Sequence, residues 1–220
     1  MHVREHRLYE DDGTPVPFVA SPHQSDDVDP RCLLVHYTAS LTIESCVMWF
    51  LDPAARVSAH VIVGRDGRTV QMVPFDRRAW HAGQSRWQQL ENLNAYALGV
   101  ELVNAGALER TADGGWIDWA GHRLPECDVQ IARHQHESID RGWHEFPARQ
   151  VDRALAIAKA LRACYGFDAV LGHDDVAPGR KLDPGPAFPM AQFAADVIGG
   201  RPTAVSASVS DERVTTERAR

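Results

Sequence analysis

The segment from Gly172 to Pro186, GHDDVAPGRKLDPGP, gathers several side chains that can do chemistry. It holds His173, Lys181 and Asp183, and its glycine and proline content is typical of a loop and excludes a central strand or a helix. Loops held by a rigid scaffold often carry function. Because His173 follows an apolar run, we expect it at the tip of a strand, where Asp183 on the returning loop can meet it. These two residues are therefore candidate metal ligands.

Two further strands are expected to end in reactive side chains, His36 after CLLV and Glu101 in ALGVEL. Ligands of open α/β sheets bind outside the carboxyl ends of strands, so His36, Glu101 and His173 are expected to converge. Together with Asp183, the two histidines make three metal ligands with a fourth position left for water, as in catalytic zinc sites. Glu101 can then take the proton of that water, and Lys181 can stabilise the oxyanion formed when the water attacks a carbonyl.

The elements that position these residues are predicted from apolar periodicity and turn residues. An Asp-Gly turn between the β-rich runs SAHVIV and RTVQMV predicts a hairpin. The order of strands and helices predicts the α/β class, with a mixed central β-sheet flanked by helices. The expected elements are a strand at 32–35, a helix capped by Ser40 or Thr42 and ended by Pro53, the hairpin, a strand at 97–102, a helix from Pro147 at its first position to Gly166, a strand from Ala169 to His173, and a helix at 190–198.

Other segments lack such periodicity. Residues 1–30 are polar and rich in proline, and we expect an irregular N-terminal arm packed on the domain of residues 31–200. Residues 74–95 are interpreted as a functional loop. The polar stretch at about 107–146 is interpreted as an insertion near the site, because structureless segments of this length usually act as lids or binding elements. Residues 201–220 are predicted to be a disordered tail.

Composition narrows the class of protein. The chain has 220 residues, of which 44% are hydrophobic and 24% charged, and this fits one globular domain. A net charge of -7 argues against nucleic acid as the main partner. The charged N-terminus lacks the apolar core of a secretory signal, and no run approaches the roughly 18 apolar residues of a membrane span. We therefore expect a cytoplasmic protein, with export by a route other than Sec left open.

The four cysteines form no CxxC pair, which argues against a zinc ribbon or a thioredoxin-like motif. We interpret Cys32, Cys46, Cys127 and Cys164 as free thiols in a reducing compartment. A disulfide between Cys32 and Cys46 is the alternative.

Four motifs resemble a known family. VHYTAS, VSAHVIVGRDGRTVQMVPFDRRAWHAGQS, LGVEL and GHDDVAPGRKLDPGPAF are similar to the zinc-dependent N-acetylmuramoyl-L-alanine amidases of the AmpD type, which are related to peptidoglycan recognition proteins. The resemblance covers roughly residues 31–195. It implies a mixed sheet flanked by helices, one Zn²⁺ ion, and hydrolysis of the amide between the lactyl group of N-acetylmuramic acid and L-alanine. The implied partners are polymeric peptidoglycan or its muropeptide fragments.

Matched residue by residue, the resemblance implies His36, His173 and Asp183 as zinc ligands, Glu101 as the catalytic carboxylate and Lys181 as the residue that stabilises the oxyanion. Tyr37 follows the first ligand, where recycling enzymes for soluble anhydro-muropeptides more often have Asn. A tyrosine there is similar to the branch that also attacks polymeric peptidoglycan.

Five more residues are candidates for substrate binding. Trp80 and His81 in AWHAG are expected to wall the cleft, because an aromatic face can stack on a sugar or a peptide. Arg56 is expected to pair with acidic groups of the peptide stem, the alternative being a surface charge. His60 either packs in the core or lines the site, and Asn94 is a further cleft candidate.

A second group of potential metal ligands lies in the insertion. His122, Cys127, His134 and His136 have suitable side chains, and RHQHE invites a second metal site. Their spacing fits no standard site, so we favour a polar lid.

Two other functions compete with the amidase. A muropeptide sensor without activity could share the fold, but such proteins usually lose a ligand, and all three ligands are present here. A lysin that reaches the cell wall without Sec would share the chemistry and differ in its preference for intact sacculi.

Overall fold

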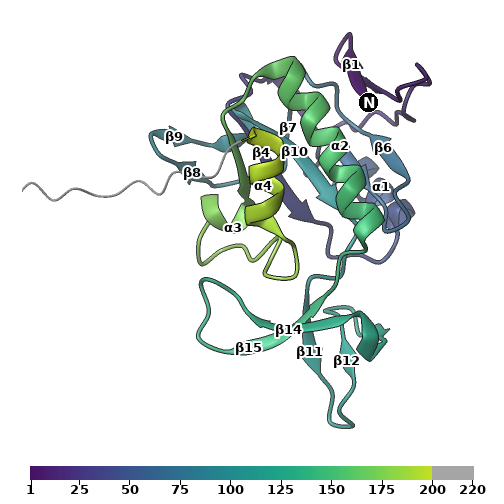
Figure 1. Ribbon diagram of the computed structural model, residues 1–220, viewed down its shortest axis with the longest axis vertical. Coiled ribbons are helices and arrows are strands. Elements are labelled where there is room, and N and C mark those ends of the chain that lie inside the picture. The colour runs from purple at the N-terminus through teal and green to yellow at the C-terminus, as the bar shows by residue number, and fades with distance from the viewer. Residues whose placement is uncertain (200–220) are drawn as a thin grey trace, which may run out of the picture.

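The computed structural model describes residues 1–199 (Figure 1). Its centre is a five-stranded sheet in the order β16 (Ala169–Gly172), β4 (Cys32–Tyr37), β10 (Ala97–Leu102), β5 (Val61–Val63) and β6 (Thr69–Gln71). The first four strands pair in parallel, and β6 pairs antiparallel with β5 through the predicted hairpin. The predicted mixed sheet is thereby confirmed.

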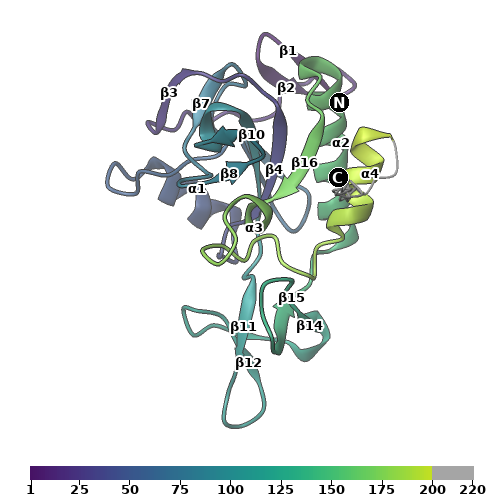
Figure 2. The same cartoon turned by 90° about the vertical axis from the view of Figure 1, so that its left-hand side faces the viewer.

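The two faces of the sheet are covered by different elements because successive side chains of a strand point to opposite faces. Leu33 and Val35 pack under α2 (Ala148–Tyr165) and α4 (Met190–Ile198). Cys32 and Leu34 point the other way, toward Val176 of α3 (His173–Val176), and the residues of α1 (Ile43–Leu51) pack on Ile62 of β5. Figure 2 shows α2 and α4 on one side of the sheet and α1 and α3 on the other.

The helix ends agree with the sequence prediction. Thr42 caps α1 by accepting a hydrogen bond from the backbone N–H of Ser45, and Gly166 ends α2 in the left-handed conformation at φ 68°. Pro147 lies one position earlier than predicted, as the N-cap of α2. The segment predicted as a loop after β16 begins with the single turn of α3, because Asp175 accepts a hydrogen bond from the backbone N–H of Gly172 and so starts a helix.

The N-terminal arm is not irregular, contrary to the prediction. β1 (His2–Arg4) pairs with β2 (Arg7–Tyr9), and β3 (Gln24–Asp27) pairs with β7 (Arg77–Ala79). These strands are too short for an alternating pattern to stand out, and only Val3 and Leu8 of the first pair pack on the main core. The presumed loop at 74–95 likewise contains β7, the hairpin of β8 (Arg86–Trp87) and β9 (Leu90–Glu91), and a 3-10 turn at Leu93–Ala95.

The insertion also differs from the prediction, because it is a second antiparallel sheet. Its strands are β11 (Ala107–Arg110), β12 (Trp116–Ile117), β13 (Arg123–Leu124), β14 (Val129–Arg133) and β15 (Asp140–His144), in the order β13-β12-β11-β15-β14, with a 3-10 turn at Glu126–Asp128 before β14. Figures 1 and 2 show this sheet below α3, beyond one end of the central strands. Its strands are short, and buried side chains such as Leu108 and Leu124 stand among exposed ones, so their sequence carries no strong apolar pattern.

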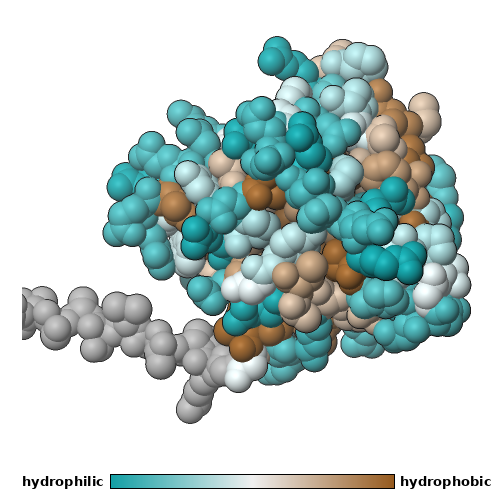
Figure 3. Space-filling view, turned by 90° about the horizontal axis from the view of Figure 1, so that it is seen from above, coloured by the Kyte–Doolittle hydropathy of each residue, from teal (hydrophilic) through white to brown (hydrophobic). Residues whose placement is uncertain are grey.

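The outer surface is largely hydrophilic on the face seen in Figure 3, where small apolar patches are scattered among polar side chains. Among residues 1–199, no helix is long and apolar enough to cross a membrane. The four cysteines are free thiols. The predicted tail at 201–220 lies outside the described residues, and the cytoplasmic location stays a prediction.

Candidate metal centre and active site

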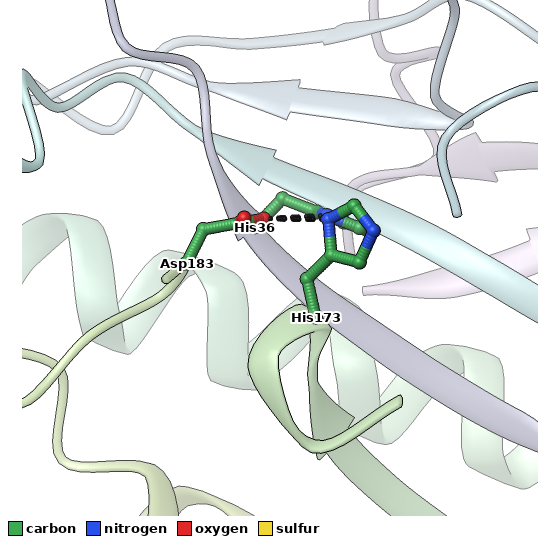
Figure 4. A group of neighbouring side chains, drawn as sticks. All are labelled: His36, His173 and Asp183. Carbon is green, nitrogen blue, oxygen red and sulfur yellow. Dashed lines mark hydrogen bonds and ion pairs between the residues drawn. The ribbon is translucent and has the colours of Figure 1, made fainter. Parts of the chain in front are cut away.

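Three elements bring the candidate ligands together. His36 lies near the carboxyl end of β4, and His173 begins α3 directly after the neighbouring strand β16. Asp183 lies on the loop after α3. The backbone N–H of Asp174 donates to the Asp183 carbonyl at 2.9 Å and so holds this loop against the start of α3. Figure 4 shows the three side chains pointing toward one another. The predicted convergence of strand ends is therefore seen in the structure.

The three ligand atoms are close and buried. His36 Nδ1 and His173 Nδ1 lie 2.9 Å apart, and each lies 2.9 Å from Asp183 Oδ2. The residues are 1%, 2% and 7% exposed. Within residues 1–199, this is the one group of three or more histidine, cysteine or acidic residues whose ligand atoms all lie within 4.8 Å of one another.

The protonation of His173 follows from its second ring nitrogen. Nε2 lies 3.0 Å from the carbonyl oxygen of Ala82. A carbonyl only accepts, so Nε2 carries the proton and donates it, and Nδ1 presents a lone pair to the centre. Arg180 Nη2 donates to the same carbonyl at 2.8 Å and so helps to hold it in place.

The tautomer of His36 follows in the same way from its contact with His81. His81 Nε2 lies 3.3 Å from the Ala97 carbonyl and must donate to it, so His81 Nδ1 is the acceptor in its 3.0 Å contact with His36 Nε2. His36 therefore keeps its proton on Nε2 and presents the Nδ1 lone pair to the centre. Burial lowers the pKa of His36 to about 4 and that of His81 well below the usual value, so both rings are neutral.

The donor set fits a divalent cation. The side chain of Asp183 adds a carboxylate at neutral pH, since the ordinary pKa of an aspartate is about 3.9. Two lone pairs and one carboxylate oxygen thus face a common point with no proton between them. Two neutral imidazoles and one carboxylate form a ligand set that suits zinc.

Glu101 lies beside these ligands. It is paired in register with His36 on adjacent parallel strands, so the two side chains share one face of the sheet. It is 8% exposed, and its Oε2 has no hydrogen-bond partner among residues 1–199. The pKa of Glu101 is raised to about 8, first by burial and then by the charge of Asp183, against the opposing effect of the Lys181 ammonium. A carboxyl group and an ammonium thus lie close to the candidate ligands.

Residues 26–186 match the family described as N-acetylmuramoyl-L-alanine amidase. The chain belongs to this amidase family. The amidase is 34% identical over 197 residues to the 1,6-anhydro-N-acetylmuramyl-L-alanine amidase AmpD of Escherichia coli K12, covering 80% of this chain and 88% of that protein.

Solved structures agree with the assignment. The amidase matches a crystal structure of AmpD with a TM-score of 0.58 and 27% identity, covering 90% of this chain and 99% of that one. It matches AmiD from E. coli, in complex with the substrate anhydro-N-acetylmuramic acid-L-Ala-D-gamma-Glu-L-Lys, with a TM-score of 0.58 and 29% identity, covering 89% and 68% of the two chains. The predicted fold and family are thus confirmed.

Three of the predicted substrate-binding residues line one cavity of the amidase. Arg56, Trp80 and Asn94 border a space of about 400 Å³, together with Arg78 and Gly83. Asn94 also accepts hydrogen bonds from the backbone N–H groups of His81 and Ala82, the two residues that contact the candidate ligands His36 and His173.

The other three lie away from this cavity. His81 is 6% exposed and lies behind His36 rather than on a cleft wall. His60 is fully buried, where its ring accepts from the Gly99 N–H and donates to the Arg77 carbonyl, so packing rather than lining is its role in the structure. The ring of Tyr37 packs on Gly106, where an added Cβ would lie only 2.3 Å from it, so Tyr37 supports the base of the insertion.

The histidines of the insertion do not gather into a second metal site among the described residues. His134 Nε2 instead lies 2.9 Å from Asp174 Oδ2, with both groups buried, and His136 Nε2 contacts the Asp174 carbonyl at 3.1 Å. His122 pairs with Asp118 in the turn between β12 and β13, while Cys127 is exposed. Sequence reasoning singled out RHQHE but missed Asp174 and Arg180, because no local pattern indicates their distant partners.

Proposed function

We propose that this amidase is zinc-dependent and cleaves the amide between the lactyl group of N-acetylmuramic acid and L-alanine. The observation that carries the proposal is the convergence of His36 Nδ1, His173 Nδ1 and Asp183 Oδ2 with both histidine protons held elsewhere. These three atoms would hold the ion. When bound, zinc supplies a Lewis acid that polarises a carbonyl and makes a water molecule more acidic.

Glu101 would move the proton in this reaction. Its Oε2, buried without a hydrogen-bond partner in the described chain, would accept a proton from the attacking water and later deliver it to the leaving amine of L-alanine. A pKa near 8 in the protein without zinc suits such a group, since a bound cation favours the charged form and brings the pKa closer to neutrality. Lys181 would place its positive charge on the carbonyl oxygen as negative charge develops there.

The names of the relatives support the substrate class. AmpD of E. coli is named for 1,6-anhydro-N-acetylmuramyl-L-alanine, and the AmiD complex holds an anhydro-N-acetylmuramic acid tripeptide. We propose muropeptides or polymeric peptidoglycan as the substrate of this amidase. The exposed guanidinium of Arg56, on the cavity shared with Trp80, would pair with the acidic groups of the peptide stem.

The decisive measurement is mass spectrometry of the products formed from intact sacculi and, separately, from soluble anhydro-muropeptides. Each incubation is run with and without a chelator and again after zinc is added back. Stem peptides that begin at L-alanine, lost on chelation and restored by zinc, would support the proposal, and the substrate that works would separate a lysin from a recycling enzyme. Failure to release peptide from either substrate, in protein shown to contain zinc, would favour a sensor without activity.

A further inference from the structure

The insertion contacts the two chain segments that follow the candidate ligands His36 and His173. His134 reaches Asp174, next to His173, and the indole Nε1 of Trp119 donates to the carbonyl of Ala39 at 2.7 Å, three residues after His36. In Figures 1 and 2 the insertion lies beside α3 and the ends of the central strands. The insertion sheet therefore borders the active site at two points.

The two contacts differ in their exposure. His134 is 1% exposed, whereas Trp119 is 75% exposed although its N–H is held by Ala39. The other tryptophans of the insertion, Trp116 and Trp143, are 5% and 1% exposed and pack in its interior. Trp119 is thus a large aromatic ring held in one orientation with most of its surface in water.

The turn that carries Trp119 is well ordered by its own contacts. Asp118 is 3% exposed, and its carboxylate accepts from the N–H groups of Ala120 and His122 at 2.9 and 2.8 Å. The carboxylate also contacts His122 Nδ1, and Gly121 completes the turn at φ 85°. Because the ring is already fixed, a ligand that stacks on it would cause little further loss of side-chain entropy.

We propose that Trp119 is the stacking platform of a saccharide subsite, which binds a pyranose ring of the glycan next to the muramoyl unit whose amide is cleaved. The proposal rests on the proposed function, which places a sugar on the lactyl side of the cleaved bond. The C–H face of a pyranose packs well on an indole, and stacking on a neutral ring needs no positive charge. That suits a chain of net charge -7, which would not attract an anionic glycan electrostatically.

The test compares two soluble substrates of the zinc-loaded enzyme that carry the same tripeptide. One has N-acetylmuramic acid alone, and the other has a chain of four alternating N-acetylglucosamine and N-acetylmuramic acid residues. Trp119→Ala should lower kcat/KM for the longer substrate about threefold to tenfold more than for the shorter one, mainly through KM. Trp119→Phe, which keeps a ring but loses the bond to Ala39, should lie between Trp119→Ala and the wild type.

Ile131→Ala is the matched control, because Ile131 is 60% exposed on β14 of the same sheet. It should leave the ratio of the two kcat/KM values unchanged. Equal losses on both substrates, or no loss on either, in Trp119→Ala would overturn the subsite, and equal losses would assign Trp119 a role in holding the Ala39 loop. A wild-type enzyme that releases peptide from neither substrate would instead contradict the proposed function.

Discussion

His36 offers its Nδ1 lone pair to a metal because its Nε2–H is held in a hydrogen bond to His81 Nδ1. The ring of His81 has room because residue 99 is glycine, where an added Cβ would lie 2.6 Å from it. Partners of this kind fix the tautomer of a ligating histidine and its orientation. His81 is therefore a positioning residue, one contact removed from the proposed zinc ion.

Replacing His81 tests this role. The side chain in His81→Phe cannot accept the hydrogen bond from His36 Nε2–H, so this variant should bind zinc about 10-fold to 100-fold more weakly. The side-chain carbonyl in His81→Gln can accept that hydrogen bond, so this variant should preserve most of the affinity. Zinc affinity is measured by competition with a chromogenic chelator. His60→Gln, in the same buried row but without contact to His36, is the control. Wild-type affinity in His81→Phe would show that the tautomer of His36 does not depend on this contact.

Glu101→Gln tests the proposed proton transfer. The amide has nearly the same shape but cannot accept the proton, so kcat should fall by about 10²-fold to 10⁴-fold. Zinc content, measured by atomic emission, should equal that of the wild type because Glu101 is not among the proposed ligands. A variant that retains wild-type turnover would remove Glu101 from the reaction.

The insertion is joined to α3 by the pair formed by His134 and Asp174. Both groups are buried, and Gln135 adds a bond to the same carboxylate at 3.0 Å. The contact joins residues that are 40 positions apart and lies within the turn of α3 that begins with His173. The stability of α3 is therefore expected to depend on the insertion.

His134→Leu should lower the free energy of unfolding by about 1–3 kcal/mol, because it leaves a buried carboxylate with fewer partners. Urea unfolding measures the loss, and hydrogen exchange should show faster exchange in β14 and α3. Arg133→Ala is the neighbouring control, since its ion pair with Asp140 is exposed and should contribute less than about 1 kcal/mol. An equal effect of both changes would argue against the buried contact as the link.

At the scale of the whole molecule, neutral buried histidines are expected to limit stability in acid. Burial is the first cause that lowers the pKa of His36, His60 and His144, each to about 4. An unfolded chain binds these protons near its ordinary pKa of about 6.5, whereas the folded chain binds them only near 4. The stability they contribute is thus present above about pH 6.5 and is lost as the pH falls toward 4.

The metal-free protein should therefore lose stability steeply between pH 6.5 and 4, by up to roughly 3 kcal/mol for each such histidine. The urea midpoint, measured at several pH values in this range, gives the slope. His60→Gln should reduce the slope, because glutamine can replace both backbone hydrogen bonds of His60 without binding a proton. The same slope in the variant and the wild type would exclude a contribution from His60.

Local sequence patterns were sufficient to predict the hairpin, α1, α2, α4 and the strands at 32–35 and 97–102, the first of which runs on to Tyr37 in the structure. Apolar runs, turn residues and caps act over a few neighbouring positions, so these elements can be predicted without knowledge of the fold. The positions of His36, Glu101 and His173 at strand ends followed from the same runs, and their convergence followed from the expected sheet.

Only the tertiary structure decided what lies around these residues. The contact of His36 with His81 joins residues 45 positions apart, and Trp119 reaches Ala39 across 80 positions. Whether a histidine walls a cleft or lies behind a ligand, and whether a polar segment is a lid or a second sheet, depends on such distant contacts. Side-chain type and spacing could therefore name the proposed metal ligands, but which ring nitrogen faces the centre is determined by backbone carbonyls and side chains from other parts of the chain.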